Sequence, residues 1–117
     1  MTVRRLKTYT SDQGYVYQYY FVGKRSLNES SGRADEYVFD VSSDRKTMQA
    51  VSVSFPEAAR LAWTRAHSRS LSDAEQYAAA KLLLLKAFDD STDAAIDPRL
   101  FLTVELLDEL LARVGID

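Results

Sequence analysis

The sequence predicts an α+β fold in which a four-stranded antiparallel β-meander precedes three α-helices that pack on one face of the sheet. The segment 14–23 is the most β-prone run, the segment 49–55 alternates between apolar and polar residues, and the second half follows helical periodicity. Strands gathered in one half of a chain and helices in the other are typical of this class. We expect a single domain over residues 1–117, with the sheet in 1–55 and the helices in 56–117.

Residues 3–10 and 14–23 predict the first two strands, joined by a tight hairpin. The second strand holds five aromatic side chains, which favour the pleated surface of a sheet. Asp12 and Gln13 suit the right-handed positions of a three-residue hairpin loop, and Gly14 suits the left-handed position that follows. This loop length fixes the register of the two strands and therefore the side chains that share a face.

In this register, seven basic and aromatic side chains share one face of the hairpin. They are Arg5, Lys7, Tyr9, Tyr15, Tyr17, Tyr19 and Phe21. Stacked rings flanked by cations can bind single-stranded nucleic acid, because bases stack on the rings and the cations meet the phosphates. The alternative is that the same rings form the core beneath the helices. The net charge of −2 favours the core, since nucleic-acid-binding modules are usually basic.

Two further strands are predicted, over residues 36–41 and 49–55. Residues 26–35 are small and polar, which predicts a loop, and residues 42–46 predict the next turn. The last strand shows the clearest alternation, with one apolar and one polar face: Val51, Val53 and Phe55 against Ser52 and Ser54. This alternation indicates a sheet with one covered face and one face in water.

The first two helices are predicted from their starts and their apolar stripes. The first covers residues 56–67, where Pro56 suits the first turn of a helix. The second begins after Ser72, because the Ser72 and Glu75 side chains form the pattern of a capping box. Its apolar positions continue to about Phe88.

The third helix is predicted over residues 98–114. Asp97 is its expected N-cap, Pro98 suits its first turn, and Gly115 is placed to end it. Thr103 is an alternative start for a shorter helix in the same region.

The second and third helices carry more leucine than one sheet face is expected to bury. Apolar surface that remains exposed at this scale usually marks an interface, and a two-fold homodimer is its commonest form. The side chains expected to form this partner surface are Leu83, Leu84, Leu106 and Leu110.

The sequence contains no complete catalytic or metal-binding set. It has no cysteine, and its one histidine, His67, is expected near the end of the first helix, where it stabilises the last carbonyls. Four carboxylates cluster after the second helix, but the spacing departs from that of a calcium loop, which requires glycine where this chain has Ala94. The cluster consists of Asp89, Asp90, Asp93 and Asp97. We expect no enzymatic activity, no cofactor and no bound metal.

No segment approaches the roughly 20 apolar residues that span a bilayer. The longest uninterrupted apolar run is Leu82–Leu85, and the N-terminal residues lack the apolar stretch of a signal peptide. We therefore expect a cytoplasmic protein that does not enter a membrane.

These observations favour a non-catalytic binding or interaction module, which we expect to be homodimeric. One alternative is single-stranded nucleic-acid binding by the aromatic sheet face. The other is small-molecule binding between the sheet and the helices, through tyrosine hydroxyls.

Overall fold

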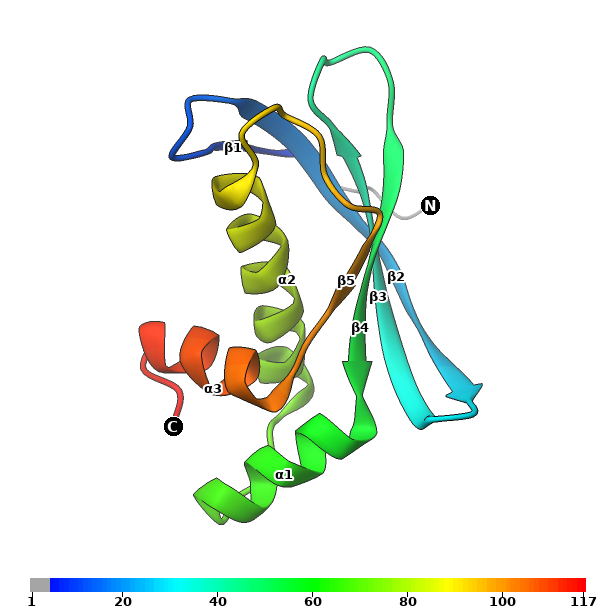
Figure 1. Cartoon of the computed structure of the whole chain (residues 1–117), viewed down its shortest axis with the longest axis vertical. Helices are drawn as coiled ribbons and strands as arrows, with labels where there is room; N and C mark the ends of the chain where they lie inside the picture. The colour runs from blue at the N-terminus through cyan, green and yellow to red at the C-terminus, as the bar shows by residue number, and fades with distance from the viewer. Residues whose placement is uncertain (1–4) are drawn as a thin grey trace.

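The computed structural model describes residues 5–117, which form five strands and three helices. In chain order these are β1 (Lys7–Thr10), β2 (Val16–Glu29), β3 (Gly32–Ser42), β4 (Gln49–Pro56), α1 (Glu57–His67), α2 (Asp73–Asp90), β5 (Arg99–Phe101) and α3 (Val104–Arg113). The first four strands form an antiparallel meander, and β5 adds to β4 in parallel. The helices all lie on one side of the sheet (Figure 1). The predicted α+β architecture is confirmed, with β5 as a small addition.

The register of the first hairpin is as predicted. Tyr9 pairs with Tyr17 and Lys7 pairs with Tyr19. Gly14 has a φ of 88°, and its amide donates to the Ser11 carbonyl at 2.9 Å, which closes the three-residue loop. The part of the predicted first strand that falls in residues 1–4 lies outside the described residues.

The segment 26–35, predicted as a loop, instead continues the sheet. β2 and β3 run through it and leave only Ser30 and Ser31 as the turn. This end of the hairpin diverges from α1 (Figure 1), and apart from half-buried Leu27 the side chains of residues 26–33 are exposed, which is why they are mostly polar. Ser26 Oγ donates to Asp35 Oδ1 at 2.8 Å across the two strands. The polar composition of residues 26–35 therefore reflects two paired strands that are exposed to solvent. Its interpretation as a loop was wrong.

The helix predicted over 98–114 is also wrong at its beginning. The chain first adds β5 to the free edge of β4, where the Ser52 amide donates to the Pro98 carbonyl at 2.8 Å. The Leu102 amide donates to the Ser54 carbonyl at 2.9 Å. These bonds satisfy backbone groups of an edge strand that a longer α3 would leave unpaired.

The starts of α2 and α3 are set by side-chain caps. Ser72 and Glu75 form the predicted capping box at the start of α2. Thr103, the alternative start, is the cap of α3, and its hydroxyl accepts from the Leu106 amide at 3.2 Å. Asp97, the expected cap, lies before β5 and caps no described helix.

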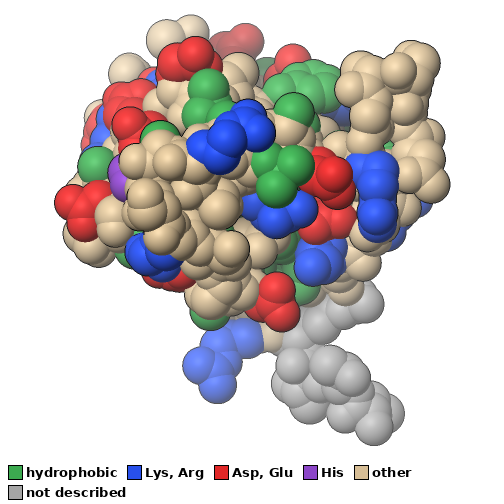
Figure 2. Space-filling view, turned by 90° about the horizontal axis from the view of Figure 1, so that it is seen from below, with side chains coloured by type: hydrophobic (Ala, Val, Ile, Leu, Met, Phe, Trp, Pro, Cys, Tyr) green, Lys and Arg blue, Asp and Glu red, His purple; other side chains and the backbone are tan. Residues whose placement is uncertain are grey.

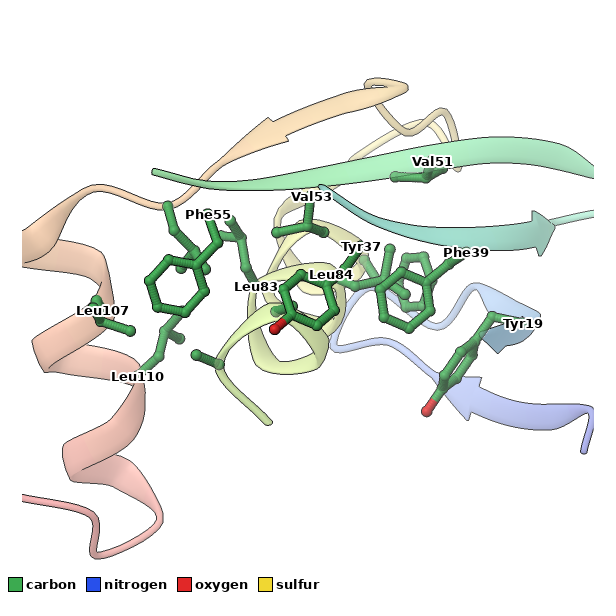
Figure 3. Close-up of a cluster of buried hydrophobic side chains, with 14 of the residues drawn as sticks. Tyr19, Tyr37, Phe39, Val51, Val53, Phe55, Leu83, Leu84, Leu107 and Leu110 are labelled. Carbon is green, nitrogen blue, oxygen red and sulfur yellow. The ribbon is translucent and has the colours of Figure 1, made fainter. Parts of the chain in front are cut away.

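The core lies between the inner face of the sheet and the helices. Alternate residues of β2, β3 and β4 point toward α2, and α3 packs against α2 from the side (Figure 3). The largest fully buried side chains are Trp63, Tyr17, Phe39, Phe88, Leu84, Leu102, Leu107, Leu110, Leu111, Val51 and Val53. Each such side chain stabilises the fold by roughly 1.5–3 kcal/mol relative to an exposed one.

Candidate functional site

The predicted aromatic face is the covered face of the sheet. Tyr17 and Tyr19 are buried, and Tyr17 stacks on Phe88 of α2 with ring centroids 4.2 Å apart. The remaining rings of this face, those of Tyr9, Tyr15 and Phe21, are partly buried against the same core; Lys7 is half-buried, and Arg5 is exposed just before β1. Strand alternation thus brings the predicted residues together, but nucleotide bases cannot reach the buried rings in the folded protein.

Two tyrosine hydroxyls at the rim of this face are used within the fold. Tyr9 Oη donates to Asp89 at 2.8 Å, and Tyr15 Oη donates to the Thr92 carbonyl at 2.7 Å. Burial, followed by the hydrogen bond to the Asp89 carboxylate, raises the pKa of Tyr9 to about 12. These bonds tie the first hairpin to the end of α2.

The cavity beside Tyr17 is too small for a metabolite. Its volume is about 50 Å³, and its lining includes Gln49 and Ile96. The buried Tyr17 hydroxyl has no hydrogen-bond partner among the described residues. A space of this size holds a water molecule or two, whereas ligand pockets begin at roughly 300 Å³.

The predicted leucine surface is not free either. Leu83, Leu84 and Leu110 are buried in the core, and only Leu106 is half-buried at its margin. The wide apolar arc of α2 is explained by burial on two sides, because the sheet covers one side and α3 covers another. These side chains therefore stabilise the monomer.

His67 joins α1 to α3. Its ring stacks on Trp63 with centroids 4.1 Å apart, and its Nε2 lies 2.9 Å from Asp108 Oδ1. Arg69 approaches the same Trp63 ring at 5.1 Å. This histidine therefore takes part in packing and in a contact between helices.

The four clustered carboxylates each have a separate local partner. Asp89 accepts from Tyr9, Asp90 pairs with Lys86, Asp93 accepts from the Ala95 amide and Asp97 accepts from the Arg99 amide. Within residues 5–117, no group of three or more His, Cys, Asp or Glu side chains is placed to hold a metal ion.

No helix of the described chain covers the outer face of the sheet, which lies opposite α1, α2 and α3 (Figure 1). The strand registers arrange its side chains in rows across the strands. One row runs Gly23, Val38, Ser52, Arg99, and the next runs Arg25, Glu36, Ser54, Phe101. In the middle of these rows, the residues of β4 are both serines, whose side chains are short, whereas the residues of β5 are the long side chains of Arg99 and Phe101.

A trough runs along this outer face as three adjoining hollows. The first, about 400 Å³, is lined by Val22, Gly23, Lys24, Arg25, Val38, Ala50 and Ser52. The second, about 130 Å³, shares Arg25 and Ser52 with it. The third, about 320 Å³, shares Phe101 with the second and extends to Leu61 of α1.

The first hollow results from the sequence of β2. A register shift between Phe21 and Gly23 makes Val22 a bulged residue, which bends the strand. Gly23 has no side chain, and a Cβ placed there would meet no atom within 4 Å. On β4, Ala50 supplies only a methyl group. Neither Gly23 nor Ala50 therefore fills the hollow with a side chain.

Phe101 projects from the same face. Its side chain is 59% exposed, which is unusual for a phenylalanine within a strand, and Leu61 beside it is 40% exposed. Because a helix was predicted over residues 98–114, Phe101 was not predicted as an exposed residue of a strand. Burial alternates along exposed Arg99, half-buried Leu100, exposed Phe101 and buried Leu102. The sequence itself has three consecutive apolar residues here, so it carries no signal that Phe101 is exposed.

A second, polar cleft lies on the helix side of the sheet, where the β2–β3 hairpin meets the starts of α1 and α2. Its volume is about 290 Å³. Its charged lining consists of Lys24, Arg33, Arg60, Asp35, Glu57 and Asp73. Figure 2 views the molecule from the end at which α1 and this hairpin lie, and basic and acidic side chains adjoin one another there.

No protein-family model, curated protein or solved structure matches this chain. None of the helices within residues 5–117 is both long and apolar enough to cross a bilayer. The case for function therefore depends on the two surfaces described above.

Proposed function

We propose that this chain is a non-catalytic binding module that associates with a second copy of itself through the outer face of the sheet. The observation that carries the proposal is that an exposed aromatic side chain, Phe101, and an apolar hollow beside Val38 lie on the same uncovered face. In a two-fold dimer, each copy contributes the same surface, so one face must contain both the projecting and the receiving part.

The hollow is open to solvent, and a second copy would close it over the Phe101 ring. A dry cavity of about 150 Å³ is enough to hold benzene, and the hollow beside Val38 measures about 400 Å³. Its lining from Val22, Val38 and Ala50 is apolar where the ring would insert. Burying a large aromatic side chain in such a pocket is the usual form of an interface hot spot.

The surface between Phe101 and the hollow beside Val38 allows two sheets to approach each other closely. Phe101 is on β5, the hollow spans β2 to β4, and the two-fold axis would pass between them. The outward side chains nearest that axis include Ser52 and Ser54, which are small. Packed sheets lie about 10 Å apart, and short central side chains permit that distance.

The charges of this face fit a second copy better than a polyanion. Arg25 is paired with Glu36, with Arg25 Nε 2.7 Å from the carboxylate, and Glu29 lines the trough beside them. The trough has three further cations, Lys24, Arg33 and Arg99, and one further acid, Glu57. A surface on which acids accompany the bases repels nucleic acid locally but can pair with its own copy across a two-fold axis.

The test is the molar mass in solution, measured by light scattering at about 100 μM, a concentration far above ordinary dimer dissociation constants. We expect the wild-type chain to have twice its monomer mass and Phe101→Asp to have the monomer mass. Val114→Asp is the matched control, because Val114 is 51% exposed and lies at the end of α3, away from the trough. A monomeric wild-type chain would refute the proposal, and so would a Phe101→Asp variant that dimerises as well as Val114→Asp.

A further inference from the structure

The polar cleft differs from the other charged surfaces because its ion pairs are loose. Lys24 Nζ lies 4.0 Å from Asp35, and Arg60 Nη2 lies 3.8 Å from Glu57, both beyond hydrogen-bond distance. By contrast, the pair of Arg69 with Glu75 elsewhere on the surface has two contacts of 3.1 Å. The cleft therefore contains charges of both signs that do not neutralise each other by direct hydrogen bonds.

Two charges of opposite sign in the cleft have no partner at all within the described residues. Arg33, on β3, forms no hydrogen bond or ion pair there, and neither does the Asp73 carboxylate at the start of α2. Both side chains line the same cavity of about 290 Å³. β3 thus supplies one unpaired cation, and α2 one unpaired anion, to the lining of the same cavity.

We propose that this cleft binds a small zwitterion, a molecule that carries one carboxylate and one ammonium group. Arg33 and Arg60 would receive the carboxylate, and Asp73 and Glu57 would receive the ammonium group. A ligand with only a negative charge would meet the three acids of the cleft, and a ligand with only a positive charge would meet its three bases. A molecule with both charges is repelled by neither set.

The size and exposure of the cleft limit the ligand and its affinity. A volume of about 290 Å³ is at the lower end of ligand pockets. It suits an amino acid or a dipeptide. Because the charges are partly exposed and screened by solvent, each contact contributes little, and we expect dissociation constants in roughly the millimolar range.

The experiment is a titration of the ¹⁵N-labelled chain, followed by amide chemical shifts. The zwitterions are glycine, γ-aminobutyrate and glycylglycine, which differ in the separation of their charges; acetate and methylammonium carry one charge each. We expect saturable shifts for at least one zwitterion, confined to residues 24–26, 33–35, 57–60 and 73–76, and no saturation with the singly charged ions.

Single substitutions then test which residues bind the carboxylate and which bind the ammonium group of the zwitterion. Arg33→Gln and Asp73→Asn are each expected to weaken binding of the zwitterion at least fivefold, whereas Arg65→Gln, an exposed arginine of α1 outside the cleft, leaves it unchanged. Acetate binding as tightly as the zwitterions would overturn the proposal, as would unsaturated shifts with every zwitterion at 50 mM. The cleft shares Arg33, Ala34 and Glu57 with the third hollow of the trough, which Phe101 also lines. Gly23 lines only the first hollow, so Gly23→Val should retain zwitterion binding whether or not the chain dimerises.

Discussion

Tyr17 of β2 and Phe88 of α2 stack with their ring planes 6° apart, and this contact joins the start of β2 to the end of α2. Tyr19 also packs against Phe88, with centroids 5.9 Å apart. The tyrosine-rich strand therefore helps to hold α2 on the sheet, together with β3 and β4. Its rings serve the core, and the binding surfaces lie elsewhere on the molecule.

This stacking predicts opposite effects for two substitutions at the same contact. Phe88→Ala removes a fully buried ring and is expected to lower the free energy of unfolding by about 3–5 kcal/mol. Tyr17→Phe retains the stacked ring and removes a buried hydroxyl that has no partner among the described residues, so we expect stability to be unchanged or raised by about 1 kcal/mol. Urea denaturation of both variants measures the difference. A loss of more than about 1 kcal/mol in Tyr17→Phe would mean that the hydroxyl is bonded in solution.

The sequence predicts strand pairing well where local chemistry decides it. The loop ending in Gly14 determines the register of the first hairpin, and the capping box at Ser72 determines where α2 begins. The segment 26–35 was predicted wrongly because its polar residues reflect exposure on both faces, which the sequence pattern shares with a loop. The start of α3 was predicted wrongly because pairing with the edge of β4 overrides the helical cap at Asp97.

The candidate surfaces were not predictable, because the sequence of β2, unlike that of β4, does not show which of its faces the helices cover. Tyr17 and Tyr19 alternate with Val16, Gln18 and Tyr20 in β2, and both sets are apolar enough to form a core. Which of these two sets of β2 side chains is buried depends on how helices that are distant in the sequence pack on the sheet. The hollow at Gly23 depends on a bulge, and a bulge becomes visible only when the partner strand is known.

The capping box of α2 predicts a local loss of stability. Ser72→Ala removes the acceptor for the Glu75 amide at the start of the longest helix, and we expect a loss of about 0.5–2 kcal/mol in the free energy of unfolding. Ser70→Ala is the control, because Ser70 is exposed and its hydroxyl caps no helix. Thermal denaturation of the two variants compares them directly. Equal melting temperatures would show that the cap contributes nothing to the folded state.

One buried and one partly buried tyrosine predict a loss of stability at alkaline pH. Burial raises the pKa of Tyr37 to about 12, and burial together with Asp89 does the same for Tyr9. Because both values exceed the ordinary value of about 10 in the unfolded chain, this contribution is complete below pH 10 and is lost as the pH rises toward 12. Urea midpoints from pH 9 to 12 should therefore fall more steeply for the wild-type chain than for the double variant Tyr9→Phe, Tyr37→Phe. If the urea midpoints of the two proteins fell equally with pH, the loss of stability could not be due to Tyr9 and Tyr37.

Gly23 provides a prediction in which stability and association change in opposite directions. Its backbone does not adopt a positive φ and a Cβ there meets no atom, so Gly23→Val should fit the strand and raise the free energy of unfolding by about 0.5–1 kcal/mol. The same side chain would fill the hollow that receives Phe101, so dimerisation should weaken at least tenfold. Gly32→Val is the control for conformation, because Gly32 has open space but a φ of 122°, and we expect it to destabilise the chain. Measuring thermal stability and molar mass on the same samples separates the two effects, and a Gly23→Val variant that dimerises like the wild-type chain would exclude this hollow as the interface.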